Sequence, residues 1–501
     1  MPVPAPTARG FRLALDIAAA DGGGPLFVRI ARALSADIRR GRLGPETRLP
    51  GSRALADSLG VHRNTVLAAY RELLAEGWIE SQPGRGTFVS TDLRDAELPV
   101  KAQRAKPTPA ARSSERIGFA FGARSPAPPY RPVAKGVLRM LGGLPDLRLV
   151  PNEAFARAQR RTLRHSSEIL GYGDPAGHPR LRSALADMLR NTRGLVASSE
   201  DVLITRGSQM ALSLVACALI APGDVVAVEA LGYQPAFAAL RQAGARLVPI
   251  AVDEQGLNVP LLAALIARER VRAIYLTPHH QYPTTVQLAP ARRLELLALA
   301  ARARIAVLED DYDHEFHYEG RPLLPLASSD EAGVVIYIGT LSKVFAPGIR
   351  VGYVIAPRPL LSELTHQRFY LDRQGDHVTE CALAELIEDG ELARHTRRTR
   401  RVYQARRDRC ATLLEQHFGA ALQFQRPNGG MALWARVDRA VDTERWVELA
   451  EREGVLIQGG RQFRLDESET PYVRLGYAAL DERELAEAVR RLKRAFHKAR
   501  R

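Results

Sequence analysis

Residues 339–353 read Gly-Thr-Leu-Ser-Lys-Val-Phe-Ala-Pro-Gly-Ile-Arg-Val-Gly-Tyr, and this stretch decides how the rest of the chain is interpreted. It follows the apolar run 334–338, which predicts a buried strand ending in a loop that carries Lys343. A lysine amine can form a Schiff base with an aldehyde, while hydroxyl and guanidinium groups bind a phosphate dianion. The groups available here are Lys343 for the aldehyde and Thr340, Ser342 and Arg350 for the phosphate. The same stretch is also compatible with a solvated loop lysine, so the remaining sequence has to decide.

The length and charge of the chain restrict its architecture and its partners. At 501 residues it is too long for one hydrophobic core, so two or three domains are expected. The formal net charge of +15 predicts a polyanionic partner, of which nucleic acid is the commonest. Three widely spaced cysteines form neither a metal-binding spacing nor a disulfide framework, which fits a reducing cytoplasm. The longest apolar run, 210–221, is shorter than the ~18–20 residues that span a bilayer, so no membrane partner is expected.

The N-terminal segment has the pattern of a helix-turn-helix. An amphipathic helix is predicted over 26–40, and a shorter helix runs from Ser52, its expected N-cap, to Gly60. A second short helix over 63–76 follows the turn at Gly60 and completes the motif. Its helical spacing places on the inner side Val66, Tyr70, Leu73 and Leu74. Its N-terminal end, where such a helix meets DNA bases, presents Arg63, Asn64 and Thr65.

A β-hairpin is predicted directly after the second short helix. Residues 78–81 and 87–89 have strand composition, and the turn between them reads Gln-Pro-Gly-Arg-Gly. The tip of this hairpin carries Arg85 between two glycines, a shape able to enter a minor groove. A single arginine is as well explained by a solvated surface charge, but a helix-turn-helix followed by a basic hairpin is a much more specific signal.

Residues 26–90 closely resemble the GntR-type winged helix-turn-helix. The resemblance implies double-stranded operator DNA as a partner, bound by a domain that spans residues 20–90. The DNA contacts that it implies are Arg53, Arg63, Asn64, Thr65 and Arg85. Periodicity then disappears between residues 91 and 134, where the composition predicts an extended, flexible linker.

Helix-like and strand-like segments alternate from residue 135 to residue 501. This alternation is typical of an α/β fold with a mainly parallel sheet and helices on both faces. The predicted strands are 202–204, 225–228, 246–252, 273–276, 305–308 and 334–338. In such sheets a ligand binds beyond the carboxyl ends of the strands, so the residues at those ends are candidates for a binding site.

The groups at these strand ends match the needs of a pyridine aldehyde phosphate, namely pyridoxal 5'-phosphate. Ser208 and Gln209 open a helix behind a Gly-Ser turn, whose backbone N–H groups make a phosphate seat. Tyr233 offers an aromatic ring that can stack on the pyridine. Asp310 would keep the ring nitrogen protonated, which makes the ring an electron sink, and Tyr312 would hydrogen-bond the ring hydroxyl.

The acidic run 309–315 admits other interpretations. Asp311 competes with Asp310 for the ring nitrogen, because the sequence does not determine side-chain direction to within one residue. A metal site is disfavoured, because one carboxylate cluster stands without a matching set of ligands elsewhere, and no metal is expected. A solvated loop is the remaining alternative.

Together these segments resemble the fold-type-I aminotransferases, and behind a GntR-type reader they resemble the MocR/GabR-type transcriptional regulators. The resemblance implies that Lys343 is the Schiff-base lysine of bound pyridoxal phosphate. It also implies a smaller C-terminal α+β subdomain over about 375–501. Tyr172 is implied to reach the cofactor phosphate of the neighbouring subunit in a head-to-tail homodimer. Arg474 is implied to bind the carboxylate of an amino compound, for which a bidentate arginine is suited.

Two positions depart from the family pattern. The Pro-Thr-Gly of the loop near the ring is here Pro-Thr-Thr at 283–285, which predicts a loop less able to bend. Members that respond to GABA carry an arginine shortly after the stacking tyrosine, whereas Tyr233 is followed by Gln234 and Pro235. The second departure argues against a GABA-type effector.

The combined features predict a DNA-binding transcriptional regulator that senses pyridoxal phosphate, an amino compound, or both. Catalytic turnover is not expected as its main role, although the complete set of cofactor residues leaves an active aminotransferase as the alternative. A binding module with an inactive pocket is disfavoured, because the cofactor residues are present. The predicted location is the cytoplasm.

Overall fold

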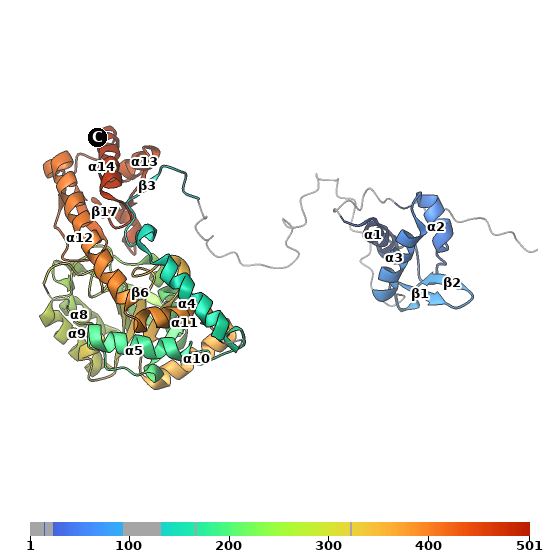
Figure 1. Cartoon of the computed structure of the whole chain (residues 1–501), viewed down its shortest axis with the longest axis horizontal. Helices are drawn as coiled ribbons and strands as arrows, with labels where there is room; N and C mark the ends of the chain where they lie inside the picture. Colours follow the sequence, from blue (N-terminus) through green and yellow to red (C-terminus); the bar gives the residue numbers. More distant parts are fainter. Residues whose placement is uncertain (1–14, 16–23, 94–131, 166–167, 321–322, 501) are drawn as a thin grey trace, which may run out of the picture. The chain divides into compact units, whose positions relative to one another are not determined.

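The computed structural model describes residue 15 and residues 24–93, 132–165, 168–320 and 323–500 (Figure 1). The chain divides into two compact units, residues 1–129 and residues 130–501. Residues 94–131, which hold most of the linker predicted at 91–134, lie outside the described residues. The first three residues of that predicted linker form a 3-10 helix, η1 (Thr91–Leu93).

The first unit consists of three helices closed by a hairpin (Figure 1). Its elements are α1 (Leu26–Arg39), α2 (Ser52–Leu59), α3 (Arg63–Ala75), β1 (Ile79–Gln82) and β2 (Gly86–Val89). The two strands pair antiparallel, with Ile79 opposite Val89. Both side chains are buried in one core with Leu34 of α1, Leu55 of α2 and Val66 of α3. This arrangement is the predicted winged helix-turn-helix.

Two local predictions for this unit are wrong. The N-cap of α2 is Gly51, and Ser52 is already its first helical residue, so the Ser52 side chain does not cap the helix. A side chain does cap the next helix, α3: Nδ1 of its N-cap residue, His62, accepts a hydrogen bond from the backbone N–H of Asn64 at 3.2 Å. Leu74 is 39% exposed, because α3 turns it away from the face that buries Leu73.

A seven-stranded sheet forms the centre of the second unit. In spatial order its strands are β4 (Val202–Thr205), β12 (Gly352–Ile355), β11 (Val335–Thr340), β10 (Ala306–Asp311), β9 (Val271–Leu276), β5 (Val225–Glu229) and β6 (Arg246–Ile250). Neighbouring strands run parallel except at β12, which is antiparallel to both β4 and β11. The mainly parallel sheet is therefore confirmed. The sequence pattern misses β12, which is only four residues long and returns directly after the Arg350 loop.

Helices cover both faces of this sheet, and the alternation of side chains along β11 separates the two cores. Ile336 and Ile338 pack on one face, and Val335 and Tyr337 pack on the other. The first face is covered by α6 (Ser208–Leu219), α7 (Gln234–Gln242) and α10 (Arg358–Leu371). The second face is covered by α5 (Pro179–Arg193), α8 (Val259–Arg268), α9 (Pro290–Ala303) and α11 (His377–Glu388), with α4 (Asn152–His165) packed on α11. Burial on both faces explains why these strands are continuous apolar runs.

A smaller antiparallel sheet lies in the C-terminal part of the second unit. Its strands in order are β13 (Leu422–Phe424), β14 (Ala432–Val437), β17 (Tyr472–Gly476) and β16 (Gln458–Gly459). The helices α12 (Glu391–Phe418), α13 (Thr443–Arg452) and α14 (Glu482–Lys498) pack with it around the buried Trp446. This core begins at Tyr403 within α12 and also takes in Met140, whereas α11 packs on the larger sheet. The predicted range of the smaller subdomain, 375–501, stays a prediction.

Short elements connect these parts. They are β3 (Leu138–Arg139), which pairs in parallel with β15 (Val455–Leu456), the β7 (Val252–Asp253) and β8 (Gly256–Leu257) pair, and the 3-10 helices η3 (Leu147–Leu149), η4 (Glu168–Leu170), η5 (Ser199–Asp201), η6 (Leu326–Ser329), η7 (Pro347–Ile349), η8 (Gly419–Ala421) and η9 (Gly460–Phe463). Among the described residues no helix is both long and apolar enough to cross a membrane.

Candidate functional site

Lys343 lies on the loop that follows β11, at the carboxyl end of the central sheet. Its Nζ lies close to the main chain of Gly143, where a Cβ would come within 3.4 Å of it. Burial lowers the pKa of Lys343, and the guanidinium of Arg474 lowers it further. More of the neutral, nucleophilic amine is therefore present than for a lysine in water. Lys343 is not a solvated loop residue.

A candidate anion-binding corner lies at the N-terminus of α6. Gly207 has a φ of 77°, and a Cβ at this position would come 2.8 Å from Nη2 of Arg350, so only glycine lets the guanidinium approach. Nη2 of Arg350 donates a hydrogen bond to the carbonyl of Arg206 at 2.8 Å, which holds the guanidinium beside Ser208, the first residue of α6. The free N–H groups of a first helical turn and a guanidinium together suit a phosphate.

Thr340 and Ser342 are buried beside this corner. The Thr340 hydroxyl accepts a hydrogen bond from the N–H of Ser342 at 3.1 Å and donates to the carbonyl of Val351 at 3.3 Å. Thr340 also pairs across the sheet with Gly352, which packs against the backbone of Gly207. The fold thereby places both hydroxyl residues next to the N-terminus of α6.

Asp310 lies near enough to Lys343 for each charge to affect the pKa of the other group. The hydroxyl of Tyr275 on the neighbouring strand β9 donates to its Oδ2 at 2.9 Å. Its Oδ1 is buried and has no hydrogen-bond partner among the described residues. Burial raises the pKa of Asp310 to about 7, the Asp311 carboxylate adds to the increase, and Lys343 opposes it. One carboxylate oxygen of Asp310 thus has no partner among the described residues, and Lys343 is near enough to lower the pKa of this carboxyl.

Asp311 points to the opposite face, because side chains alternate along β10. Its Oδ2 accepts a hydrogen bond from the Tyr337 hydroxyl at 2.7 Å and lies 3.1 Å from Nδ1 of His314. The guanidinium of Arg193, on α5, lies 3.7 Å away. Burial raises the pKa of Asp311, but His314 and Arg193 outweigh it and hold the pKa well below its ordinary value. Asp311 is therefore part of a buried structural network, and Asp310 is the carboxylate that the pocket presents.

Tyr312 belongs to the same pocket through the turn that follows β9. Its hydroxyl donates to the carbonyl of His280 at 3.0 Å. Its ring meets that of Tyr282 edge-on, with centroids 5.9 Å apart. Burial raises the pKa of Tyr312 well above its ordinary value, so it stays a neutral hydrogen-bonding phenol.

Tyr233 is the N-cap residue of α7. Burial raises its pKa to about 12, the Asp310 carboxylate contributes, and the Arg350 guanidinium opposes. Tyr233 therefore lies within electrostatic reach of both the carboxylate and the anion-binding corner. Gln209 is turned toward the same helix, since its Nε2 donates to the carbonyl of Pro235 at 3.0 Å.

Arg474 is fully buried, yet none of its three guanidinium nitrogens has a hydrogen-bond partner among the described residues. Its Cζ lies 4.0 Å from the ring centroid of Tyr282, and a Cβ at Gly142 would come 2.7 Å from it. The charge is close enough to lower the pKa of Lys343. A buried charge without a partner is costly, so this guanidinium is suited to an anion that enters the pocket. A carboxylate matches its two-pronged geometry.

Tyr172 lies apart from the other predicted cofactor residues. It is 85% exposed, and the guanidinium of Arg373 stacks over its ring at 5.1 Å. Arg373 also stacks on Phe369, at 4.1 Å from the ring centroid, and Tyr370 beside it is 75% exposed.

The predicted DNA-contacting side chains lie on the surface of the first unit. Arg53 is exposed on α2, and Arg63, Asn64 and Thr65 form the first turn of α3. Nε of Arg63 donates to the Ser52 hydroxyl at 3.3 Å, which links the two short helices. Arg85 is exposed at the hairpin tip, where its guanidinium lies 5.9 Å from the ring of Phe88.

Two segments of the chain match known protein families. Residues 26–89 match the bacterial regulatory proteins of the gntR family, and residues 142–492 match aminotransferase class I and II. The probable rhizopine catabolism regulatory protein MocR of Rhizobium meliloti is 34% identical over 95% of this chain and 94% of its own length. The HTH-type transcriptional regulator TauR of Rhodobacter capsulatus is 31% identical over 95% of this chain and 97% of its own. The chain belongs to the family of MocR-type transcriptional regulators.

The aminotransferase-like part of this MocR-type regulator also resembles solved enzymes. The α-aminoadipate aminotransferase LysN from Thermus thermophilus, complexed with N-(5'-phosphopyridoxyl)-L-leucine, matches with a TM-score of 0.68 and 32% identity. That match covers 73% of this chain and 93% of LysN. The fold-type-I aminotransferase fold of the second unit is thereby confirmed.

The loop at 283–285, where the MocR-type pattern has a glycine, bends in spite of its threonine. Thr285 has a φ of 65°, in the left-handed region that glycine favours. The expectation of a loop less able to bend stays a prediction, since one backbone conformation does not measure how far the loop moves. A β-branched residue in this conformation costs about 1–2 kcal/mol.

Several groups in the pocket escaped the sequence analysis of this regulator. Gly142 and Gly143 approach Arg474 and Lys343 from far away in the sequence, and only their Gly-Gly pattern after a short strand could have signalled a close contact. Two phenols near the site are Tyr275, which hydrogen-bonds to Asp310, and Tyr282, which contacts Arg474. Tyr275 lies in an apolar strand and Tyr282 in a loop, and no sequence pattern distinguishes either of them.

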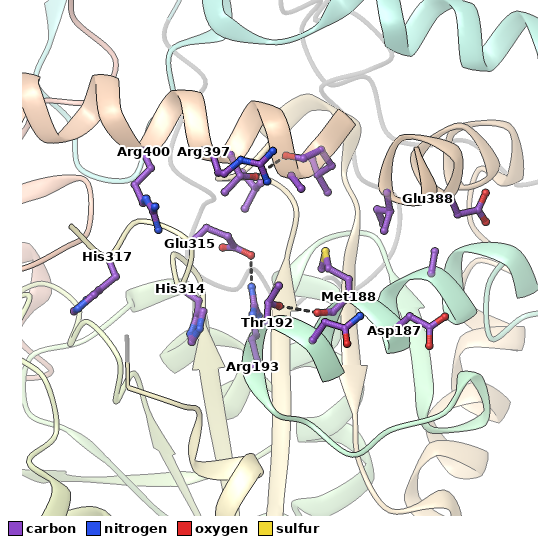
Figure 2. A pocket seen from close by; sticks show the side chains of 17 residues that line it. Asp187, Met188, Thr192, Arg193, His314, Glu315, His317, Glu388, Arg397 and Arg400 are labelled. Atoms are coloured by element: carbon purple, nitrogen blue, oxygen red, sulfur yellow. Dashed lines mark hydrogen bonds and ion pairs between the residues drawn. The ribbon is translucent and has the colours of Figure 1, made fainter. Parts of the chain in front are cut away.

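A cavity of 440 Å³ lies between α5, α11 and α12 and the segment after β10 (Figure 2). Arg193 and Glu315 form an ion pair in its wall. Arg400 of α12 and the imidazoles of His314 and His317 also line it (Figure 2). None of the sequence-predicted cofactor residues lines this cavity, which borders a histidine cluster that the sequence analysis did not anticipate.

Proposed function

We propose that this MocR-type regulator binds operator DNA through α3 and the β1–β2 hairpin and senses an amino compound at a pyridoxal-phosphate site around Lys343. The observation that carries this function is the buried guanidinium of Arg474, which has no hydrogen-bond partner in the part of the chain that the structure describes and lies beside a desolvated lysine in a chain with a DNA-binding unit. Family membership supports the regulator and its cofactor. The individual residue roles rest on the geometry of the pocket.

The residues of the pocket fit pyridoxal phosphate. When bound, this cofactor supplies an aldehyde that condenses with primary amines and a pyridine ring that accepts electrons. Arg350, Ser208 and the N–H groups of α6 would hold its phosphate, with Thr340 and Ser342 beside them and Gln209 at the same helix end. The orphaned Oδ1 of Asp310 would accept a hydrogen bond from the protonated ring nitrogen. Tyr233 would cover the ring, and Tyr312 would bind its hydroxyl.

Arg474 supplies the specificity for an amino compound that carries a carboxylate. A bidentate pair with the guanidinium would hold the ligand near Lys343, because Arg474 and Lys343 approach the adjacent residues Gly142 and Gly143. A ligand amine then competes with the Lys343 amine for the cofactor aldehyde. For this competition to alter DNA binding, the regulator must have two conformational states that differ in affinity for DNA. The ligand shifts the balance between them only if it binds one state more tightly than the other.

The exposed aromatic surface around Tyr172 supports a head-to-tail homodimer. The side chain of Tyr172 is 85% exposed in one chain. In a dimer its hydroxyl would bind the cofactor phosphate of the second copy. Sedimentation equilibrium of the full chain should give a dimer, and Tyr172→Phe should weaken retention of the cofactor without loss of the dimer. A strictly monomeric chain would contradict this part of the proposal. A DNA-binding regulator of this kind acts in the cytoplasm.

Covalent trapping of the cofactor tests the central assignment. The chain is incubated with pyridoxal phosphate, reduced with borohydride, and digested for mass spectrometry. The wild type and Lys135→Ala, a control at an exposed lysine, should carry the cofactor on the peptide that contains residue 343. Lys343→Ala should carry none, and unchanged labelling in this variant would overturn the assignment.

A working aminotransferase is the second candidate, because Lys343 and Arg474 are both retained in one pocket. It predicts sustained conversion of an amino acid and a 2-oxo acid by the purified chain. If the chain is a regulator, an amino compound should change its affinity for DNA. The DNA is a site that the chain itself selects from a pool of random sequences. Steady turnover with no effect on DNA affinity would favour the enzyme.

A further inference from the structure

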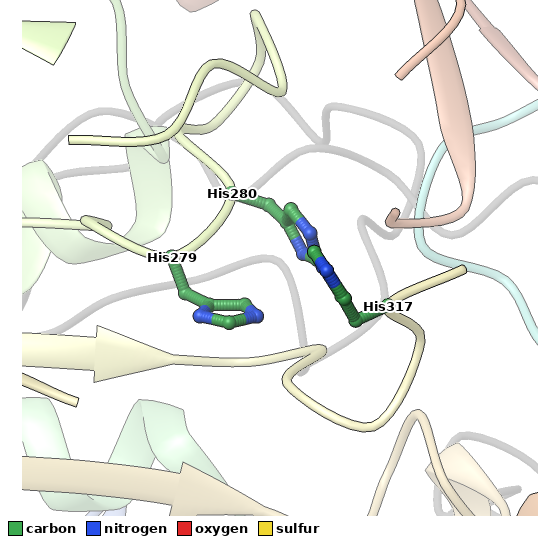
Figure 3. Close-up of side chains that lie close together, drawn as sticks. All are labelled: His279, His280 and His317. Carbon is green, nitrogen blue, oxygen red and sulfur yellow. The ribbon is translucent and has the colours of Figure 1, made fainter. Parts of the chain in front are cut away.

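Three histidines meet at the carboxyl ends of β9 and β10. His279 and His280 follow β9, and His317 lies after β10, which is its parallel neighbour in the sheet. Because parallel neighbours end at the same edge, the two segments come together although they are far apart in sequence. One ring nitrogen from each of the three residues lies within 4.8 Å of the others (Figure 3).

These imidazoles are buried and lack the partners that buried polar groups need. His279, His280 and His317 are 2%, 1% and 7% exposed. Within the described part of the chain, both ring nitrogens of His279, Nε2 of His280 and Nδ1 of His317 have no hydrogen-bond partner. Each buried polar atom left unpaired costs about 1–3 kcal/mol, so four such atoms in one place indicate a missing ligand.

The remaining nitrogen of His280 is oriented as in a metal site. Its Nδ1 lies 2.8 Å from Oδ1 of Asp313, and both side chains are almost completely buried. Histidines that bind metals commonly donate their second N–H to a carboxylate in this way, which turns the other nitrogen toward the ion. Here the other nitrogen of His280 is Nε2, which has no hydrogen-bond partner among the described residues.

We propose that His279, His280 and His317 bind a divalent transition-metal ion, with Zn²⁺ as the best fit. Imidazole nitrogen suits zinc, copper and nickel, whereas magnesium and calcium require oxygen ligands. Tetrahedral zinc with bonds of about 2.0–2.1 Å places its nitrogen ligands about 3.4 Å apart, so small rotations of the three rings complete the site. Three protein ligands leave a fourth position for water or an incoming group.

The surroundings give the ion room and a route. Gly429 packs against the His280 ring, and a Cβ at this position would overlap Nε2 of His280. His317, which pairs through its backbone with Gly429, lines the 440 Å³ cavity of Figure 2. His280 lines a second cavity of 950 Å³. The cluster is therefore reached from two sides, although its rings are buried.

The ion would stiffen the wall of the cofactor pocket. The carbonyl of His280 accepts the hydrogen bond from Tyr312, so the turn that carries two of the ligands also holds a residue of that pocket. Binding at the histidines would link this turn to the segment at His317 and, through its pairing, to Gly429 in the loop between β13 and β14. The proposal itself does not depend on the cofactor, because every ligand comes from this chain.

Metal binding is measured on the full chain prepared without a histidine tag. The chain is stripped with a chelator and dialysed against Zn²⁺, and the bound zinc is counted by atomic emission. The wild type should retain one zinc per chain, and Zn²⁺ should raise its melting temperature. With Co²⁺ it should show the intense visible ligand-field absorption of a four-coordinate nitrogen site.

Variants locate the ion. His279→Gln and His317→Gln should each remove the bound zinc and the thermal shift, and Asp313→Asn should weaken binding about 10- to 100-fold. Gly429→Ala should act like the histidine variants by steric overlap. His366→Gln, at an exposed histidine of α10, is the matched control and should retain one zinc. Circular dichroism of the metal-free variants establishes that each one folds.

Two results would overturn the proposal. One is a wild type that retains no zinc after dialysis. The other is zinc retained equally by the wild type and by folded His279→Gln and His317→Gln, which would place the ion elsewhere. Covalent labelling at Lys343 is measured in parallel, so a failed cofactor site is distinguished from a failed metal site.

Discussion

The guanidinium of Arg474 lies over the ring of Tyr282, with Cζ 4.0 Å from the ring centroid. The contact partly compensates a buried charge that has no hydrogen-bond partner in the described part of the chain, since a cation is attracted to an aromatic face. The arginine is thereby held in place with its donors free. The arrangement favours ligand binding over stability, because an unpaired charge in the interior is unfavourable until an anion arrives.

Arg474→Met should therefore abolish the response to amino compounds with a carboxylate and, in the ligand-free chain, raise the free energy of unfolding by ~1 kcal/mol. The gain comes from removing an unpaired buried charge. Ligand titration followed by cofactor absorbance measures the first effect, and denaturant unfolding measures the second. Arg436→Met, at an exposed position on β14, is the control and should change neither. A ligand response that survives in Arg474→Met would remove Arg474 from the binding site.

The attachment of pyridoxal phosphate to Lys343 should depend on pH in a defined direction. Burial and Arg474 lower the pKa of Lys343 from its ordinary value of 10.5, so the reactive neutral amine is reached at lower pH. The rate of attachment should rise with pH and reach half its maximum clearly below 10.5. Stopped-flow absorbance across the pH range measures it. In Arg474→Met the midpoint should move up, and a midpoint at 10.5 in the wild type would contradict the desolvated environment.

Asp310 and Asp311 should behave differently when each is changed to asparagine. Asp311→Asn should lower the free energy of unfolding by ~3 kcal/mol, because it leaves the buried Arg193 partly unpaired. Asp310→Asn should change stability by less than ~1 kcal/mol and instead weaken cofactor retention. Since the folded-state pKa of Asp311 is depressed, its contribution is present above its ordinary value of 3.8 and lost as the pH falls below it. The stability difference between Asp311→Asn and the wild type should therefore shrink at acid pH.

Thr285→Gly should raise the free energy of unfolding by ~1 kcal/mol, because it relieves a β-branched residue at a φ of 65°. The neighbouring Thr284→Gly is the contrast. It removes a hydroxyl that donates to Oε1 of Gln281 at 2.6 Å, so it should lower stability by ~1 kcal/mol. Urea unfolding measures the free energy of unfolding of both variants and the wild type. A destabilised Thr285→Gly would show that the loop carries no such strain.

Arg63→Ala and Arg85→Ala should each weaken DNA binding and reduce the slope of log affinity against log salt by ~1, because each lost phosphate contact releases fewer counterions. Fluorescence anisotropy at several salt concentrations measures both quantities. Arg241→Ala removes an exposed charge from the second unit and should leave the slope unchanged. If all three variants show the same slope, Arg63 and Arg85 do not contact phosphate.

Much of the architecture is predictable because its signals are local. Helical and strand periodicity occupy short windows, so the order of helix, turn, helix and hairpin, and the six apolar strands, follow from neighbouring residues. Lys343 and Arg350 are recognisable for the same reason, since a single loop contains both. The antiparallel β12 escapes because four residues carry too little pattern, and the misjudged cap at Ser52 reflects a choice between adjacent backbone positions.

The chemical kinds of the groups, a lysine, an arginine and two adjacent aspartates at strand ends, were determined by the sequence alone. The tertiary structure decided which of them share a space. Strand alternation turned Asp310 toward Lys343 and Asp311 toward Arg193, and close packing left Arg474 buried without a partner among the described residues. The parallel pairing of β9 and β10 brought His279 and His317 together. Burial, desolvation and pairing depend on neighbours that are distant along the chain, so no local pattern of residues contains them.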